Sequence, residues 1–589
     1  MSSRRAHAPL LAATVIAALG CRGRPRSWEV PIEGDRPREG GAAVLEIDLT
    51  AGAPERRRGG FFSLPSHDSF DALVAALRQA EARKEVKGVF LAFGTASLGW
   101  ARAHELGDAL ARLRANKVPV TCHADAWDNA SYAAAARGCA TIAMSPGGEV
   151  ELTGPSATVP FANELLEKKL HAQVDILQVG KFKGAAEPLT RDGPSPEYRQ
   201  SLENALGAVR DAYAKALATR GVEGLLGGGP FMAQEAKQRK LVDVLLDRKQ
   251  AREQAKRDAG GVPIDVIFGA GPEGPQKLDL LDVLRTLGPR GGDGPTRPHV
   301  QLLRLDGEIV LGGEGGLLGG PGGIVARKLV DRAHALAKEP SVRAVVLRID
   351  SPGGSALGSD LAWIALEELR AAKPLVVSVG ELAASGGYYL ASSGAKIYAE
   401  PESIVGSIGV VGGKVSFGGT LQDLGVHTAT FGDRRAAQLG SLTEPWDEAT
   451  RTRLLQGMTE IYELFLSRVA EGRGRKREDF VNAVEGRVFG GEQAKSLGLV
   501  DEVGGLGDAL ADAKKRAGLP ADAPVVVDDA GGLLEAISGD DEALARSGLA
   551  LPPEAPPELV ALRAWLLTFV LSTHGAGVAA MMPAPLVVR

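Results

Sequence analysis

Net charge, cysteine and uninterrupted hydrophobic stretches are all scarce in this sequence of 589 residues. Its 68 Lys and Arg against 73 Asp and Glu give a formal net charge of −5, which argues against nucleic acid as the main partner. An apolar run over 8–19 is too short to cross a membrane comfortably. A second apolar run, over 565–588, is broken by glycine and proline, so we expect it to pack against the body of the protein.

The three cysteines are assigned two different roles. Cys122 and Cys139 lie in an alanine-rich segment, where they could pair, although small buried core thiols are the favoured interpretation. Cys21 follows Arg4-Arg5, the apolar run and Gly20, which together are typical of a bacterial export signal. A cysteine directly after a small residue there predicts a lipoprotein cleavage site with Cys21 as the lipid attachment point. An uncleaved N-terminal anchor is the alternative.

A serine-containing turn is the most informative local feature. The sequence Ala-Ala-Ser-Gly-Gly-Tyr over 383–388 follows an apolar strand at 375–379 and precedes a small-residue helix at 388–393. A serine at such a strand-to-helix turn exposes its hydroxyl and has a free backbone N–H beside it. Ser385 is therefore a candidate nucleophile, and the N–H of Gly386 a candidate oxyanion donor. The structural alternative is an ordinary turn serine.

A second glycine turn lies about thirty residues earlier. A buried strand over 345–350 ends in Ser-Pro-Gly-Gly-Ser at 351–355, and this turn can offer another backbone donor. Gly354 is the favoured oxyanion donor, with Gly353 as its competitor. Ser407 and Asp350 could order the site through hydrogen bonds.

The base for such a serine is not an obvious histidine, since none of the nine histidines lies in a comparable turn. The segment 179–188 instead places Lys183 where a strand end enters a glycine-bounded loop with apolar neighbours. A lysine acts as a general base only when burial lowers its pKa from ~10.4 towards neutrality. Lys181 alternates to the opposite face of the strand and is the natural misassignment, while a solvated lysine is the structural alternative.

With these motifs in order, the sequence resembles the long, two-domain form of the signal peptide peptidase A (protease IV) family, bacterial membrane-associated serine peptidases with a Ser/Lys dyad. The resemblance runs from about residue 44 to 515. It rests on the segments 351–355, 383–388, 406–410, 181–188, 487–489 and 498–501.

The resemblance implies Ser385 as nucleophile and Lys183 as general base, with no metal and no cofactor. It also implies tandem α/β superhelix domains of the Clp-protease/crotonase type, a homotetramer, and degradation of signal-peptide remnants and other apolar peptides. The expected location is the periplasmic side of the cell membrane, anchored at the N-terminus.

An internal repeat with an offset of about 255 residues organises the chain. Strand-like and turn-like segments recur in both halves, alternating with amphipathic helices expected at 71–83, 102–115 and 359–371. The predicted divisions are an export signal (1–21), a first repeat supplying the lysine (42–268), a Gly/Pro-rich linker (269–298), a second repeat supplying the serine (299–515) and a C-terminal extension (516–589). A short helix is expected within the linker at 278–287.

The two copies differ where the chemistry lies. Opposite Ser385 the first half has Ala130, or Ser131 after a slip of one residue, and that serine is interpreted as an ordinary helix-start residue. Opposite Lys183 the second half offers Arg434 and Arg435, and arginine stays protonated at neutral pH. The sequence thus predicts one composite site per chain.

Two other classes of function share parts of this pattern. A crotonase-type acyl-CoA enzyme would use the same fold and oxyanion turns without needing Ser385 and Lys183 together. A non-catalytic membrane scaffold would tolerate the loss of both. The basic cluster over 473–477 is interpreted as a solvated face, with anionic lipid contact as the alternative.

Overall fold

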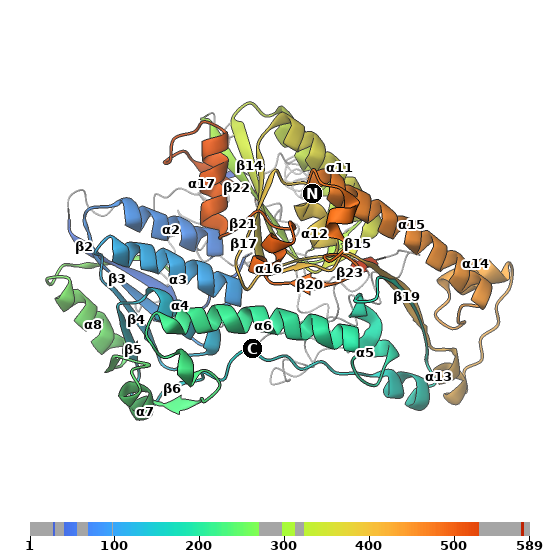
Figure 1. The fold of residues 1–589 in the computed structure, drawn as a ribbon, viewed down its shortest axis with the longest axis horizontal. Helices are drawn as coiled ribbons and strands as arrows, with labels where there is room; N and C mark the ends of the chain where they lie inside the picture. Colours follow the sequence, from blue (N-terminus) through green and yellow to red (C-terminus); the bar gives the residue numbers. More distant parts are fainter. Residues whose placement is uncertain are drawn as a thin grey trace, which may run out of the picture.

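The computed structural model describes residues 27–29, 41–55, 69–96, 98–269, 297–312, 323–528 and 579–581. Two parallel β-sheets, one from each half of the chain, form its framework (Figure 1). The first sheet has the order β10-β2-β3-β4-β5-β9. Its strands are β2 (Ala43–Leu49), β3 (Val86–Phe93), β4 (Val120–Ala124), β5 (Thr141–Met144), β9 (Val244–Leu245) and β10 (Ile264–Phe268).

The second sheet repeats this order strand for strand. It runs β22-β11-β14-β16-β17-β21, and β1 (Ser27–Glu29) adds an antiparallel edge to β22. Its strands are β11 (His299–Asp306), β14 (Val342–Ser351), β16 (Leu375–Ala384), β17 (Lys396–Ala399), β21 (Glu502–Val503) and β22 (Val525–Asp528). The predicted tandem α/β repeat is confirmed. Because β22 takes the place of β10, the second repeat reaches residue 528, beyond the boundary predicted at 515.

Helices cover these sheets because their apolar faces have the helical period that the sequence predicts. The main ones are α2 (Phe70–Ala82), α3 (Trp100–Ala115), α10 (Ala326–Lys338) and α11 (Ala356–Ala372). The helix α11 begins earlier than expected because the Ser355 hydroxyl accepts the N–H of Gly358 and caps it. Each half has its own hydrophobic core, centred on β3 in the first and β14 in the second.

A third sheet joins the two halves. Its order is β13-β12-β15-β23-β19-β7. The strands are β7 (Gln173–Val179), β12 (Ile309–Val310), β13 (Ile324–Val325), β15 (Gly353–Ser355), β19 (Val410–Ser416) and β23 (Ala579–Met581). β7 of the first repeat pairs antiparallel with β19 of the second, from Val179↔Val410 to Gln173↔Ser416. This pairing carries the loop after β7 into the second half.

Buried ion pairs also hold the halves together. Arg348 on β14 lies 2.6 Å from a carboxylate oxygen of Glu55 and 3.5 Å from one of Glu105. Burial alone would raise the pKa of Glu55, but the Arg348 guanidinium lowers it below its usual value. The helix α6 (Pro196–Ala218) runs along both halves, from α4 (Asn129–Gly138) to β20 (Val488–Phe489) (Figure 1).

Cys122 and Cys139 form a disulfide, which corrects the interpretation of both as core thiols. Cys122 lies on β4 and Cys139 follows α4, which returns antiparallel over its own strand and brings the two Cα atoms within 6.0 Å. Both residues are fully buried, as the alanine-rich context suggests. The sequence pattern gave the burial but not the distance.

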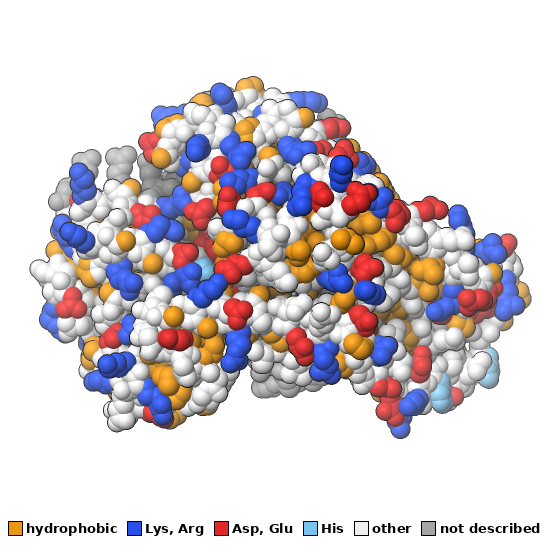
Figure 2. Space-filling view, in the orientation of Figure 1, with side chains coloured by type: hydrophobic (Ala, Val, Ile, Leu, Met, Phe, Trp, Pro, Cys, Tyr) orange, Lys and Arg blue, Asp and Glu red, His pale blue; other side chains and the backbone are white. Residues whose placement is uncertain are grey.

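Some predicted features lie outside the described residues, among them the export signal with Cys21 and the helix expected at 278–287. Among the residues that the structure does describe, no helix is both long and apolar enough to cross a membrane. Positive and negative side chains are interspersed over the visible face of the molecule (Figure 2), which agrees with its small net charge.

We expect Arg348→Met to lower the free energy of unfolding by about 3–5 kcal/mol, because it leaves the buried carboxylates of Glu55 and Glu105 without their cation. Denaturant unfolding followed by circular dichroism measures this change. Arg343→Met, at an exposed position on the same strand, is the matched control and should change little. Equal stability of the two variants would show that the ion pairs do not hold the interface.

Candidate active site

Ser385 lies at the junction of β16 and the short helix α12 (Gly386–Ala391), as predicted from the sequence. Its φ is 55°, in the left-handed region that non-glycine residues rarely adopt. The strain is held by backbone hydrogen bonds on both sides, since the Ser385 N–H donates to the Gly406 carbonyl (2.7 Å) and its carbonyl accepts from Tyr389 (2.8 Å). The side chain is fully buried.

Glycine is required in the two turns that meet at this serine. A Cβ on Gly387 would lie 2.5 Å from the Ser351 carbonyl oxygen, and one on Gly354 would lie 2.2 Å from the Ile309 carbonyl oxygen. A Cβ on Gly386 would lie 3.2 Å from the Cα of Gly353. The serine turn and the Pro-Gly-Gly turn therefore approach each other at backbone distance.

This approach places the two predicted oxyanion donors on adjoining backbones. The Gly353 N–H donates to the Ser351 hydroxyl (3.2 Å), so it is already engaged within its own turn. That contact favours Gly354 over Gly353 as the donor from this strand. Gly386 begins α12, and the first N–H groups of a helix have no partner within it.

Lys183 reaches Ser385 from the other repeat. It follows β7, and its Nζ lies 2.6 Å from the Ser385 Oγ. The same nitrogen donates to the carbonyl oxygen (2.8 Å) and the hydroxyl oxygen (2.9 Å) of Ser407. The structure therefore brings together the serine and lysine that the sequence places about two hundred residues apart.

The environment of this amine favours its neutral form. Lys183 is fully buried, and burial lowers its pKa well below the ordinary value. Its three acceptors are neutral oxygens, and none is a carboxylate that would stabilise the ammonium. An amine with a lowered pKa, in contact with a serine hydroxyl, is chemically able to accept the hydroxyl proton.

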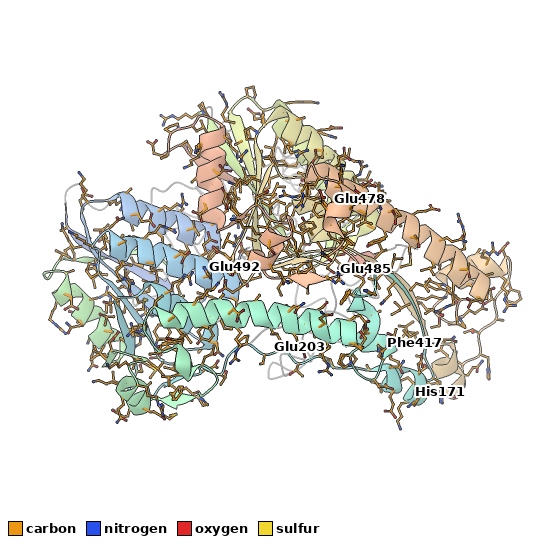
Figure 3. All side chains as sticks on the ribbon, viewed as in Figure 1. His171, Glu203, Phe417, Glu478, Glu485 and Glu492 are labelled. Carbon is orange, nitrogen blue, oxygen red and sulfur yellow. A yellow bond between two sulfur atoms is a disulfide. The ribbon has the colours of Figure 1, made fainter. Side chains whose placement is uncertain are left out.

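The second repeat fixes the backbone around Lys183. The Phe182 N–H donates to the carbonyl of Glu485 (2.8 Å), a residue labelled in Figure 3. A Cβ on Gly486 would lie 2.5 Å from the backbone nitrogen of Lys183, so the two backbones are in contact there. The guanidinium of Arg487 stacks over the Phe182 ring at 4.2 Å. The lysine loop is thus held by the half of the chain that carries the serine.

The other candidate residues, Lys181, Ser407 and Asp350, lie in different environments. Lys181 is more than half exposed and lies 3.5 Å from the Glu485 carboxylate, away from Ser385. Ser407, with φ of 53°, contacts the lysine directly, a closer involvement than the sequence indicates. Asp350 instead belongs to the charge network between the halves, where burial first and Glu55 second raise its pKa well above the usual range.

The first repeat does not duplicate the site. Ser131 donates its hydroxyl to Asp128 (2.8 Å), the residue that caps α4, and is the ordinary helix-start serine that the sequence indicates. In the second repeat, Arg434 and Arg435 open α14 (Arg434–Gly440) at exposed positions.

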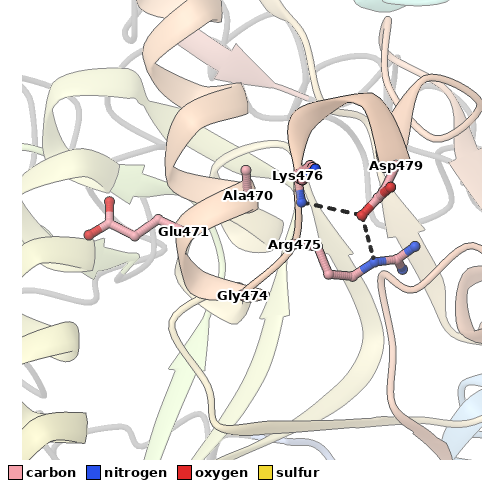
Figure 4. A pocket seen from close by; sticks show the side chains of 6 residues that line it. All are labelled: Ala470, Glu471, Gly474, Arg475, Lys476 and Asp479. Carbon is pink, nitrogen blue, oxygen red and sulfur yellow. Dashed lines mark hydrogen bonds and ion pairs between the residues drawn. The ribbon is translucent and has the colours of Figure 1, made fainter.

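The basic cluster at 473–477 lines a shallow pocket with the end of α15 (Glu448–Gly472), formed by Ala470, Glu471, Gly474, Arg475, Lys476 and Asp479 (Figure 4). Its arginines are paired with acids: Arg475 with Asp479 at 3.5 Å, Arg473 with Asp501 and Arg477 with Glu463. This pairing supports the interpretation as a solvated face rather than a lipid site.

The two α/β repeats meet at a strained, glycine-flanked serine, and this geometry is suited to acyl transfer. The family model "Peptidase family S49" matches this chain twice, at residues 112–261 and 367–520, which is more than half of its length. The chain therefore belongs to peptidase family S49. The two matches fall one in each half and agree with the structural repeat.

Individual relatives are similar over most of the chain. "Protease 4" of Salmonella typhi is 28% identical over 77% of this chain and 73% of its own length. "Protease 4" of Haemophilus influenzae is 28% identical over 75% and 72%. "Serine protease SPPA, chloroplastic" of Arabidopsis thaliana is 27% identical over 74% of this chain, and the match spans 64% of that plant protein.

We expect Lys183→Met to raise the melting temperature at neutral pH. Folding buries this amine and lowers its pKa, so below the unfolded value of ~10.4 folding must expel a proton, at a cost that grows as the pH falls. The stability gain of the variant should shrink as the pH rises towards that value. Lys181→Met, at an exposed position, is the control for the loss of a lysine and should change the melting temperature little. A gain that did not change with pH would contradict the lowered pKa.

Proposed function

We propose that this S49 peptidase is a serine endopeptidase with a Ser385/Lys183 dyad. The observation that carries the proposal is the 2.6 Å approach of a fully buried lysine amine to the serine hydroxyl. A buried amine without a carboxylate partner is costly for stability, and such costs are typical of functional sites.

In the proposed mechanism Ser385 Oγ attacks the peptide carbonyl while neutral Lys183 takes its proton. The N–H groups of Gly354 and Gly386 hold the oxyanion that forms. Lys183 then gives the proton to the leaving amine, and a water molecule, deprotonated in the same way, releases the acyl group. Ser407 orients the amine through its two hydrogen bonds.

The proposed substrates are extended apolar peptides, including signal-peptide remnants, with a small or apolar residue before the cut. Support comes from the small, uncharged residues that flank Ser385, namely Ala383, Ala384 and Gly387. The relatives named protease 4 and SPPA support a peptidase in general terms.

We propose the periplasmic side of the cell membrane as the location, with an N-terminal anchor at Cys21 and assembly as a homotetramer. The basic start, the apolar run and Cys21 support the anchor. The buried Cys122–Cys139 disulfide adds support, because such bonds persist in oxidising compartments outside the cytosol.

No specific observation favours either of the two alternative functions. A crotonase-type acyl-CoA enzyme would use the oxyanion glycines but would not need the amine of Lys183 against Ser385. A non-catalytic scaffold would need neither the strained φ of Ser385 nor a buried lysine whose pKa is lowered by burial.

Hydrolysis of a fluorogenic apolar peptide tests the dyad. We expect Ser385→Ala and Lys183→Arg each to lower kcat/KM by at least about 10³-fold, since the dyad acts as one unit and arginine cannot give up its proton. Lys181→Ala, the exposed neighbour, should keep most of the activity.

Mixing the Ser385→Ala protein with a Lys183→Ala protein should restore nothing, because one chain supplies both residues. Recovery on mixing would refute a site within one chain. An active Lys183→Arg enzyme would refute the lysine base.

The anchor has a separate test. Expression of the full sequence with radiolabelled palmitate should label the wild-type chain and not Cys21→Ser, because only the cysteine thiol accepts the lipid. Cys122→Ser controls for general loss of a cysteine. Equal labelling of wild type and Cys21→Ser would exclude lipidation at this position.

A further inference from the structure

The C-terminal strand β23 lies next to the proposed oxyanion turn. Its residues Ala579–Met581 pair antiparallel with β15 on one side, in the register Gly353↔Met581, Gly354↔Ala580 and Ser355↔Ala579. On its other side it pairs antiparallel with β19, through Ala579↔Val411. The chain's own C-terminal segment therefore fills a strand position between two elements of the candidate site.

Both neighbours of this strand lead to proposed catalytic groups. β15 carries Gly354, and its Gly353 Cα lies 3.2 Å from where a Cβ of Gly386 would be. β19 follows Ser407 and pairs with β7, the strand that delivers Lys183. An extended backbone in the position of β23 thus runs past the oxyanion donors with the Ser385 hydroxyl nearby.

The sequence of the segment has the chemistry proposed for substrates. Residues 578–582 read Val-Ala-Ala-Met-Met, which is small and apolar with no charge. Addition of a strand to a sheet edge is a general way to bind an extended peptide, with backbone hydrogen bonds giving affinity independent of sequence. The segment 579–581, called the tail below, therefore occupies backbone groups that a peptide substrate would use.

We propose that residues 579–581 act as an internal competitive inhibitor of the peptidase site. This inference rests on the proposed function. A three-residue strand binds weakly, but its covalent connection to the rest of the chain gives it an effective concentration on the order of 1 mM. The expected effect is a raised KM for short peptides, by about 2- to 10-fold, with kcat unchanged.

Proline at position 580 tests the proposal in the full-length chain. Proline cannot donate in the middle of a strand, so Ala580→Pro should weaken β23. Leu586→Pro places the same residue beyond the strand and is the matched control. For a fluorogenic apolar peptide we expect a lower KM only in Ala580→Pro, and a synthetic peptide of residues 575–589 should inhibit that variant competitively.

Hydrogen exchange provides a readout without catalysis. In a Ser385→Ala background, the amides of residues 353–355 should exchange faster with Ala580→Pro than with Leu586→Pro, whereas β2 should not change. Unchanged KM and unchanged exchange would overturn the proposal. If neither variant hydrolysed peptide but exchange changed as expected, the proposed function would fail while the tail contact stood.

Protein concentration distinguishes the source of the strand. A tail acting within its own chain gives the same KM at every enzyme concentration. A KM that rises with enzyme concentration in wild type, but not in Ala580→Pro, would assign the strand to a second copy and overturn the within-chain form.

Discussion

The contact between the Lys183 amine and the Ser385 hydroxyl is the constraint on which the rest of the structure depends. A lysine in this place must be kept from water, because solvent would restore its charge and remove its basicity at neutral pH. The burial is supplied by the opposite repeat, which encloses the lysine loop through β19, Gly486 and Ser407. The pairing of β7 with β19 is therefore as necessary to the proposed chemistry as the dyad itself.

The proposed dyad is divided between two repeats of the same fold. Both repeats keep the same strand order, so each could in principle present a turn at the end of its third strand. The second repeat carries the serine turn, in which Gly386 and Gly387 approach the Pro-Gly-Gly turn, and the first carries the lysine that follows β7. The buried Arg348 network then holds the two halves in one register.

The sequence predicts the repeat, the serine turn and the lysine loop because each has a local pattern: alternating elements, a glycine-flanked serine, and a strand end with apolar neighbours. It could not predict the Cys122–Cys139 bond, which depends on how a helix folds back on its strand. It did not predict the strands β22 and β23, since short strands take their role from partners hundreds of residues away, although it expected the run 565–588 to pack against the body. The direct contact of Ser407 with Lys183 arises from the same long-range packing, although its Gly-Ser-Ile-Gly motif marks the position.

The most direct test of the central claim is the rate at which a fluorophosphonate labels Ser385, measured as a function of pH. If a neutral Lys183 activates the hydroxyl, the second-order rate constant should rise with pH along a single ionisation well below ~10.4 and then level off. In Lys183→Ala labelling should be slow, without that ionisation. The same pH profile in wild type and variant would show that Lys183 is not the base, and would contradict this account of the site.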